Sequence, residues 1–221
     1  MLLAKDKYGY TACHIATLFD SLEALETLWH WAKKLEINID EMLLAETEEG
    51  QTAFQLAALK SHTEVLRKLW VWAEKCQTNP TELRKKLLLT KNKFGHNAWH
   101  HAVCFGRLDA METLWSWAKE VELKSDELLL VETEQGRTAF HMATQKNHIE
   151  ILQKLWVWAE KCQMNPTELR KKLLLAKDKK GYIAWHDAVC SGKLEALETL
   201  WSWAKEVELK LDAIDIVAIR K

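Results

Sequence analysis

The stretch GRTAFHMATQKNHIEILQKLW, residues 136–156, contains two helical segments joined by a short turn. The first segment begins at about Thr138, and Asn147 and His148 mark the turn. In the second segment apolar residues recur at helical spacing and form one stripe, namely Ile149, Leu152, Leu155 and Trp156. The pattern therefore predicts a pair of helices that packs through one apolar face.

The same pattern occurs five times along the chain. A glycine recurs at separations of 41, 45, 41 and 45 residues, at Gly9, Gly50, Gly95, Gly136 and Gly181. Two tryptophans keep the same step, at Trp29/Trp31, Trp70/Trp72, Trp115/Trp117, Trp156/Trp158 and Trp201/Trp203. Repeats of this length form solenoids, because one helix pair cannot bury its apolar face alone. We predict an all-α solenoid that forms one domain over residues 1–221. Its repeats cover approximately residues 1–43, 44–88, 89–129, 130–174 and 175–221, the last with a divergent C-terminal cap or a truncation.

The repeat resembles the ankyrin repeat, whose pattern is roughly DxxGxTPLHxAAxxGHxEIVxxLL. Matching residues of the first repeat are Asp6, Gly9, Thr11, Ala12, His14 and Ala16. Those of the fourth are Gly136, Thr138, Ala139, His141, Ala143, His148 and Glu150. The resemblance covers almost the whole chain, and it implies that the motif histidine makes a structural hydrogen bond near the start of the first helix.

Three positions depart from the ankyrin pattern. Alanine replaces the usual proline throughout, and Gln55 replaces the histidine in the second repeat. Alanine also replaces the glycine that ends the second helix, at Ala32, Ala73, Ala118, Ala159 and Ala204. Because alanine is the best helix former and lacks the glycine preference for a left-handed cap, we expect the second helix to continue about two turns further, to Leu123 and its equivalents.

The tryptophan pair predicts two packing faces on this longer helix. Trp115 lies on the ordinary ankyrin stripe, whereas Trp117 points about 200° away and shares a second stripe with Leu114 and Val121. Each repeat also exceeds the ~33 residues of an ordinary ankyrin repeat. The excess includes NPTELRKKLLL, in which Asn79 suits an N-cap and Pro80 the first helical position. We predict a third helix per repeat, packed on the second tryptophan. The alternative, a ladder that stacks bases or sugars, would need solvent access and a basic groove.

Composition excludes several classes of partner. The net charge is −1, so the chain has no basic excess for nucleic acid or for an anionic membrane. The N-terminus has no signal-peptide pattern, and no apolar run is long enough to span a membrane. Five cysteines without CxxC spacing predict free thiols in a reducing cytoplasm: Cys13, Cys76, Cys104, Cys162 and Cys190.

The chain contains no common catalytic motif, so we expect neither enzyme activity nor a cofactor. One histidine cluster, His96, His100 and His101, is a candidate metal site because His96 and His100 share a helical face. No carboxylate or cysteine completes a ligand set nearby. We therefore favour structural histidines over metal ligands.

Positions that differ between the repeats are the best candidates for recognition. The residues after the tip glycine are Tyr10, Gln51, His96, Arg137 and Tyr182. The residues after the motif histidine or glutamine are Ile15, Leu56, His101, Met142 and Asp187. In ankyrin proteins these positions line the concave side and its loop tips. Tyr, Arg, Met and His are plausible hot-spot types there, and drift on a solvated surface is the alternative.

We therefore predict a monomeric, non-enzymatic scaffold that binds another protein through its concave face and loop tips. Two other functions remain open at this stage. The chain could be a structural spacer or a fragment of a longer array, or the targeting part of a larger enzyme or effector. The loop tips also alternate in charge, with Lys5, Lys91 and Lys177 against Glu46 and Glu132, which favours either pairing between neighbours or a striped partner surface.

Overall fold

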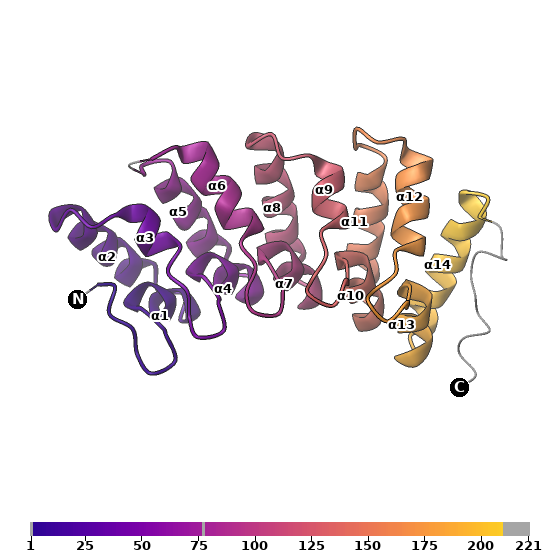
Figure 1. Cartoon of the computed structure of the whole chain (residues 1–221), viewed down its shortest axis with the longest axis horizontal. Helices are drawn as coiled ribbons and strands as arrows, with labels where there is room; N and C mark the ends of the chain where they lie inside the picture. The colour runs from indigo at the N-terminus through magenta and orange to yellow at the C-terminus, as the bar shows by residue number, and fades with distance from the viewer. Residues whose placement is uncertain (1, 77, 210–221) are drawn as a thin grey trace. The chain divides into compact units, whose positions relative to one another are not determined.

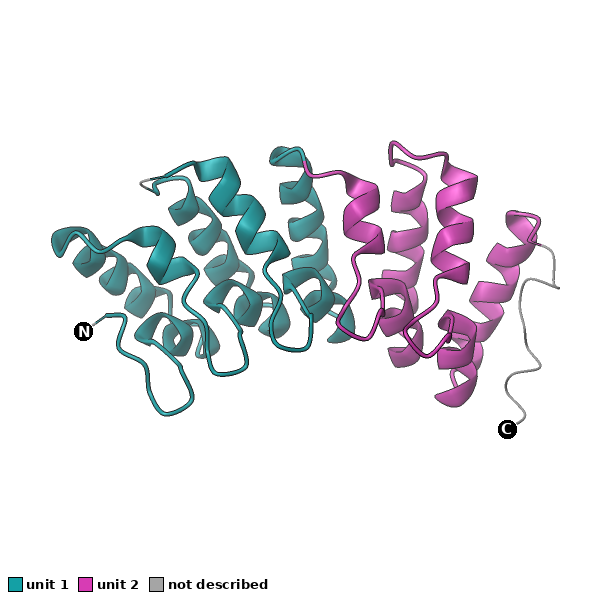
Figure 2. Cartoon of the chain, viewed as in Figure 1, with its two compact units in different colours: residues 1–122 teal, residues 123–221 magenta. Residues whose placement is uncertain are grey.

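The computed structural model describes residues 2–76 and 78–209. Over these residues the chain forms fourteen helices joined by turns, with one isolated β-bridge between Glu132 and Thr138 (Figure 1). The predicted all-α class is confirmed. The chain divides into two compact units, residues 1–122 and residues 123–221 (Figure 2). That the five repeats form one continuous domain stays a prediction.

The first compact unit holds the first two repeats and the first two helices of the third. Its first helices are α1 (Ala12–Leu18), α4 (Ala53–Lys60) and α7 (Ala98–Cys104). Its second helices are α2 (Leu22–Lys34), α5 (Thr63–Ala73) and α8 (Leu108–Glu120), and its third helices are α3 (Ile39–Leu43) and α6 (Pro80–Leu89). The first helices of consecutive repeats pack side by side, and each packs against the second helix of its own repeat.

The second compact unit has the same arrangement. It contains α9 (Ser125–Leu130), α10 (Ala139–Lys146), α11 (Ile149–Ala159), α12 (Pro166–Leu175), α13 (Ala184–Cys190) and α14 (Leu194–Glu206). The predicted third helix is thus confirmed for the first four repeats, as α3, α6, α9 and α12. The corresponding part of the fifth repeat and the predicted C-terminal cap fall in residues 210–221, outside the described residues.

Each first helix begins at the alanine that stands where the ankyrin pattern has proline. In the first repeat the Thr11 backbone N–H donates to Nδ1 of His14 at 3.1 Å. In the second repeat the Thr52 backbone N–H donates to Oε1 of Gln55, and the Gln55 backbone N–H donates back to Oγ1 of Thr52. These capping bonds define the helix start without proline, and they confirm the structural role of the motif histidine.

The tip glycines are required because consecutive loop tips touch. Gly9 has a φ of +79°, and a Cβ added to it would lie 2.5 Å from the backbone nitrogen of Glu48. That nitrogen donates a hydrogen bond to the Tyr8 carbonyl at 2.9 Å. A backbone bond therefore links the two tips at a separation that only glycine allows.

The second helix ends earlier than the sequence predicts. Helix α8 stops at Glu120, three residues before Leu123, and α5 stops at Ala73 itself. In the 41-residue type of repeat a glutamate takes the left-handed conformation that glycine usually supplies, as in Glu36 (φ 53°) and Glu122 (φ 55°). Beyond α2, the Ile37 backbone N–H donates to the Ala32 carbonyl at 2.9 Å and closes the helix end. Local backbone bonding there outweighs the intrinsic cost of a left-handed glutamate.

The two tryptophans of a pair face different neighbouring repeats. On α5, Trp72 stacks on Trp29 of the preceding repeat, with ring centroids 4.6 Å apart and planes 8° apart. Its partner Trp70 stacks on Trp117 of the following repeat at 4.6 Å and 6°. In the second unit, Trp156 stacks on Trp203 at 4.6 Å and 5°. The opposite directions of its two rings therefore join α5 to the second helices of both neighbouring repeats.

In the second and fourth repeats the third helix places an arginine over the first tryptophan, and packing of the third helix on the second tryptophan stays a prediction. The Arg84 guanidinium, on α6, lies 4.9 Å from the ring centroid of Trp70. It also forms ion pairs with Glu74 of its own repeat at 3.4 Å and with Glu120 of the next at 3.0 Å. Arg170 on α12 repeats the arrangement over Trp156. On the second tryptophans Trp72, Trp117 and Trp203, a ring of the preceding repeat covers one face.

Candidate partner-binding site

The structure places the ten predicted residues in two environments. The tip residues Tyr10, His96, Arg137 and Tyr182 are at least partly exposed, whereas Gln51 is buried. Among the first-helix residues Ile15 is exposed, but Leu56, His101, Met142 and Asp187 are buried. The first-helix positions are covered because first helices of consecutive repeats pack side by side. Leu56, His101 and Met142 therefore contribute to packing and offer little surface to a partner, and a partner-binding role for the exposed residues stays a prediction.

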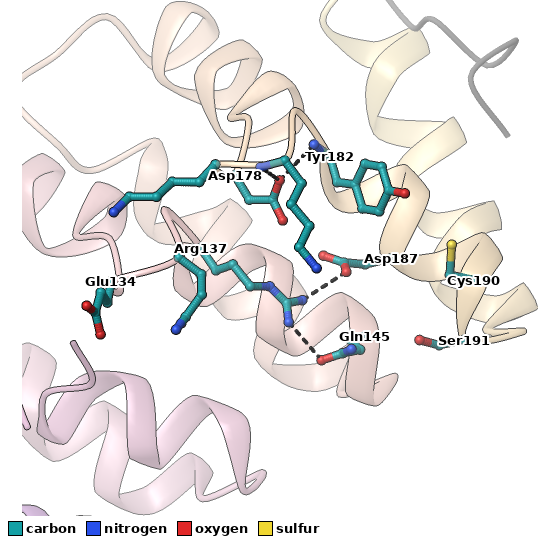
Figure 3. Close-up of a pocket in the computed structure, with 11 residues that line it drawn as sticks. Glu134, Arg137, Gln145, Asp178, Tyr182, Asp187, Cys190 and Ser191 are labelled. Atoms are coloured by element: carbon teal, nitrogen blue, oxygen red, sulfur yellow. Dashed lines mark hydrogen bonds and ion pairs between the residues drawn. The ribbon is translucent and has the colours of Figure 1, made fainter. Parts of the chain in front are cut away.

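An open pocket of about 720 Å³ lies in the second compact unit, between the tips and first helices of the fourth and fifth repeats (Figure 3). It brings together three predicted residues, Arg137, Tyr182 and Asp187. The tips add Glu134, Gln135, Asp178, Lys179 and Lys180. Helix α10 adds Gln145, and the end of α13 adds Cys190 and its C-cap Ser191. The pocket therefore combines charged, amide, aromatic and thiol groups from two repeats.

A largely buried ion pair lies at this pocket. The Arg137 Nη2 atom lies 2.9 Å from Oδ1 of Asp187, and Arg137 Nη1 donates to Oε1 of Gln145 at 3.1 Å (Figure 3). Burial raises the pKa of Asp187 above its usual value, while the charge of Arg137 opposes the shift. Among the described residues, Arg137 Nε, Arg137 Nη2 and Asp187 Oδ2 are buried atoms without a hydrogen-bond partner, although Nη2 keeps its ion pair with Asp187 Oδ1. The pair thus keeps N–H donors and one acceptor oxygen unused.

Asp178 fixes the backbone that presents Tyr182. Its Oδ1 accepts hydrogen bonds from the backbone N–H groups of Lys180 and Tyr182, both at 2.8 Å. The Tyr182 ring stacks on His186 at 5.2 Å, yet 42% of the residue remains exposed. A fixed aromatic side chain with an exposed edge suits contact with a partner, because little conformational freedom is lost on binding.

The sequence alone did not identify most of the pocket lining. Gln145, Cys190 and Ser191 lie at the ends of first helices, away from the two positions per repeat that the sequence selects. The charged tips were identified as a possible partner surface, but their convergence with Arg137 and Asp187 depends on how the two repeats stack. A ligand with both donor and acceptor groups fits this lining.

The histidine cluster of the first compact unit makes packing and capping contacts. The His96 ring lies 5.9 Å from that of His100 and 5.5 Å from that of His101. The Asn97 backbone N–H donates to Nδ1 of His100 at 3.3 Å, as expected for the motif histidine. Over the part of the chain that the structure describes, no group of three histidine, cysteine, aspartate or glutamate residues is arranged to hold a metal ion.

His101 predicts a loss of stability in acid. Burial, assisted by His96, lowers the pKa of His101 from 6.5 to about 4. The folded state therefore resists protonation, so the stability present above pH 6.5 is lost as the pH falls from 6.5 toward 4. This shift corresponds to about 3 kcal/mol. His101→Leu, which copies Leu56 of the second repeat, should remove this contribution.

Urea unfolding at several pH values checks this prediction. As the pH falls from neutral to 4, the free energy of unfolding of the wild type should drop by about 3 kcal/mol more than that of the His101→Leu variant. A difference between the two proteins that stays constant with pH would show that His101 does not titrate in this range.

Two further features bear on the class of protein. No helix among the described residues is both long and apolar enough to cross a membrane. All five cysteines are free thiols, and Cys13 is buried, which raises its pKa to about 12. Such a thiol is poorly reactive, because the thiolate is the reactive form.

Comparison with known proteins identifies the repeat family. The family model for ankyrin repeats (3 copies) matches residues 72–168. A search of curated proteins gives no match for the chain. The matched segment includes parts of both compact units, and the helices on either side of it have the same order and the same capping contacts. Residues 72–168 therefore contain ankyrin repeats.

Proposed function

We propose that this chain is a non-enzymatic scaffold that binds another protein through the pocket between its fourth and fifth repeats. Ankyrin repeats in general are protein–protein interaction modules. The observation that supports this particular site is the pocket of about 720 Å³ that gathers Arg137, Tyr182 and Asp187. These are residues at which the repeats differ, whereas packing alone would tolerate identical repeats.

The binding mechanism follows from the rigidity of the lining. Tyr182 lies on a backbone fixed by Asp178, and Arg137 is held by both Gln145 and Asp187. A partner that fills the pocket pays little to order these side chains, so more of the contact energy contributes to affinity. The free thiols support action in a reducing compartment, where cysteines of this kind persist.

Site-specific photo-crosslinking tests the proposed function. We would place p-benzoylphenylalanine at position 182 of the full chain, and as the matched control at position 8, where Tyr8 is also exposed on a loop tip but lies outside the pocket. A discrete protein should crosslink at position 182 and not at position 8. Unlabelled wild type should compete for it, whereas an unlabelled Tyr182→Ser variant should compete poorly.

Two results would contradict this proposal. The same proteins crosslinked at both positions would show nonspecific contact. No crosslink at position 182, with a normally folded protein, would favour a structural spacer.

A further inference from the structure

Tryptophan stacking joins the repeats by one rule. At each of three junctions the first tryptophan of one repeat stacks on the second tryptophan of the next, at a centroid distance of 4.6 Å. Helix α5 contacts α2 through Trp72 and also through Lys68, which stands four residues before Trp72. The Nζ atom of Lys68 lies 2.6 Å from Oε1 of Glu26 on α2. Stacking and this ion pair together define how a second helix of the 45-residue type docks on α2.

The last described helix, α14, also carries a first tryptophan, but no second tryptophan stacks on it among the described residues. Helix α14 packs against α11, α12 and α13, and its Trp201 is the first tryptophan of the fifth repeat (Figure 1). Trp201 meets Trp185 edge-on at 6.2 Å and Lys205 at 5.1 Å, yet it is 38% exposed. Among the described residues no ring stacks on it, whereas Trp156, the equivalent residue of the fourth repeat, is only 4% exposed.

Helix α14 also carries the glutamate that corresponds to Glu26, namely Glu198. Glu198 stands three residues before Trp201, as Glu26 stands three residues before Trp29. Glu198 is exposed and has no ion-pair partner in the described parts of the chain. The tip of the fifth repeat is open as well, since a Cβ added at Gly181 would meet nothing within 4 Å. At Gly136, by contrast, the added Cβ would lie 3.0 Å from the backbone nitrogen of Lys179 in the next tip.

We propose that the exposed face of α14 is a docking surface for a helix of a separate ankyrin-like chain. The helix that fits has the pattern of α5 and α11, with a lysine four residues before a tryptophan. Its tryptophan stacks on Trp201 and its lysine pairs with Glu198. Residues four apart lie on the same side of a helix, so one helix makes both contacts at once.

A second copy of this chain does not fit this surface. In its first described repeat the second helix is α2, where Thr27 occupies the lysine position. The Thr27 hydroxyl already donates to the Glu23 carbonyl at 2.9 Å. The loop tips also repel, because the tip of the first repeat carries Lys5 and Lys7 and that of the fifth carries several lysines. A partner with an acidic tip, such as the ETEE of the second repeat, has the complementary charge.

Peptide binding to the full-length protein tests this inference without involving the pocket. The probe is a fluorescein-labelled peptide with the sequence of residues 149–161, IEILQKLWVWAEK, held helical by a hydrocarbon cross-link on the side away from Lys154 and Trp158. The matched control peptide has the sequence of residues 108–120, LDAMETLWSWAKE, in which Thr113 replaces the lysine. Fluorescence anisotropy should show saturable binding of the first peptide and binding of the second at least several-fold weaker.

Variants locate the binding on α14. Trp201→Ala should weaken binding at least about tenfold, because it removes the stacking platform at the centre of the contact. Glu198→Lys should weaken it several-fold, and since Glu198 is exposed this variant keeps its fold. Trp31→Ala, at the other exposed tryptophan, should leave binding unchanged.

Five outcomes would overturn the inference. The first four are equal binding of both peptides, binding unaffected by Trp201→Ala and Glu198→Lys, binding only to a chain truncated after Leu209, and no binding of either peptide to the full-length or the truncated chain. The third would make residues 210–221 the native occupant of the surface. A dimer in sedimentation that both Trp201→Ala and Trp31→Ala abolish would instead identify a second copy as the occupant, and would also overturn it.

Discussion

Replacing Trp117 by alanine should lower the free energy of unfolding by about 3–5 kcal/mol. Trp117 is only 8% exposed. Its ring stacks on Trp70 at 4.6 Å and lies 6.1 Å from that of Phe54. Truncation therefore leaves a cavity between two repeats and exposes one face of Trp70. Urea unfolding followed by circular dichroism measures the loss.

The chain supplies a matched control for this variant. Trp31 occupies the same position in the first repeat, but it is 46% exposed, and no ring stacks on it among the described residues. Trp31→Ala should therefore cost less than about half as much as Trp117→Ala. Equal losses would mean that burial between repeats is not what stabilises the second tryptophan.

Replacing Arg137 by alanine should cost about 2–3 kcal/mol near neutral pH. This loss of unfolding free energy is smaller than for a fully buried ion pair, because the two side chains are 21% and 12% exposed. The variant leaves the Asp187 carboxylate largely buried without its cation and also removes the donor to Gln145. Burial already raises the pKa of Asp187, and loss of Arg137 raises it further. The cost should therefore shrink as the pH falls and Asp187 becomes protonated.

A double variant separates the ion pair from other effects. Arg137→Gln combined with Asp187→His installs the residues that occupy the equivalent positions of the second and third repeats, Gln51 and His101. Measured above neutral pH, where the new histidine is uncharged, the double variant should lose about 1–3 kcal/mol less than the sum of its two single variants. Additive losses would show that the two side chains do not interact.

Local signals predicted most of the fold. The glycine and tryptophan spacing predicted stacked helical repeats, and Asn79 with Pro80 predicted the third helix that appears as α6. Asn79 Oδ1 accepts hydrogen bonds from the backbone N–H groups of Thr81 and Glu82, as an N-cap should. These features depend on neighbouring residues only, so one sequence was enough to find them.

The end of the second helix was predicted wrongly because propensity is a weak local preference. Alanine at position 118 favours continuation, but Glu122 adopts a left-handed conformation and α8 ends at Glu120. The cost of that conformation is about 1–2 kcal/mol, which turn bonding and packing of the following segment can exceed.

The candidate site was predicted in part. The differences between repeats selected Arg137, Tyr182 and Asp187, which the structure brings into one pocket. The same argument selected Leu56 and Met142, which are buried between helices. Residues can differ between repeats because they contact a partner or because they pack against different neighbouring helices. A difference between repeats therefore does not by itself identify a binding residue.

The residue order of this chain therefore specified its helices, its repeat length and the need for two apolar faces on each second helix, since these follow from spacing along the backbone. The stacking of repeats specified which ring meets which, that Arg84 pairs with Glu120, and that Arg137 lies 2.9 Å from Asp187. The two residues of each of these pairs are 36 to 50 positions apart in the sequence. The spacing of residues in the sequence does not predict the distance between side chains of neighbouring repeats. Such contacts form only when neighbouring repeats pack with a fixed rotation and separation of their helices.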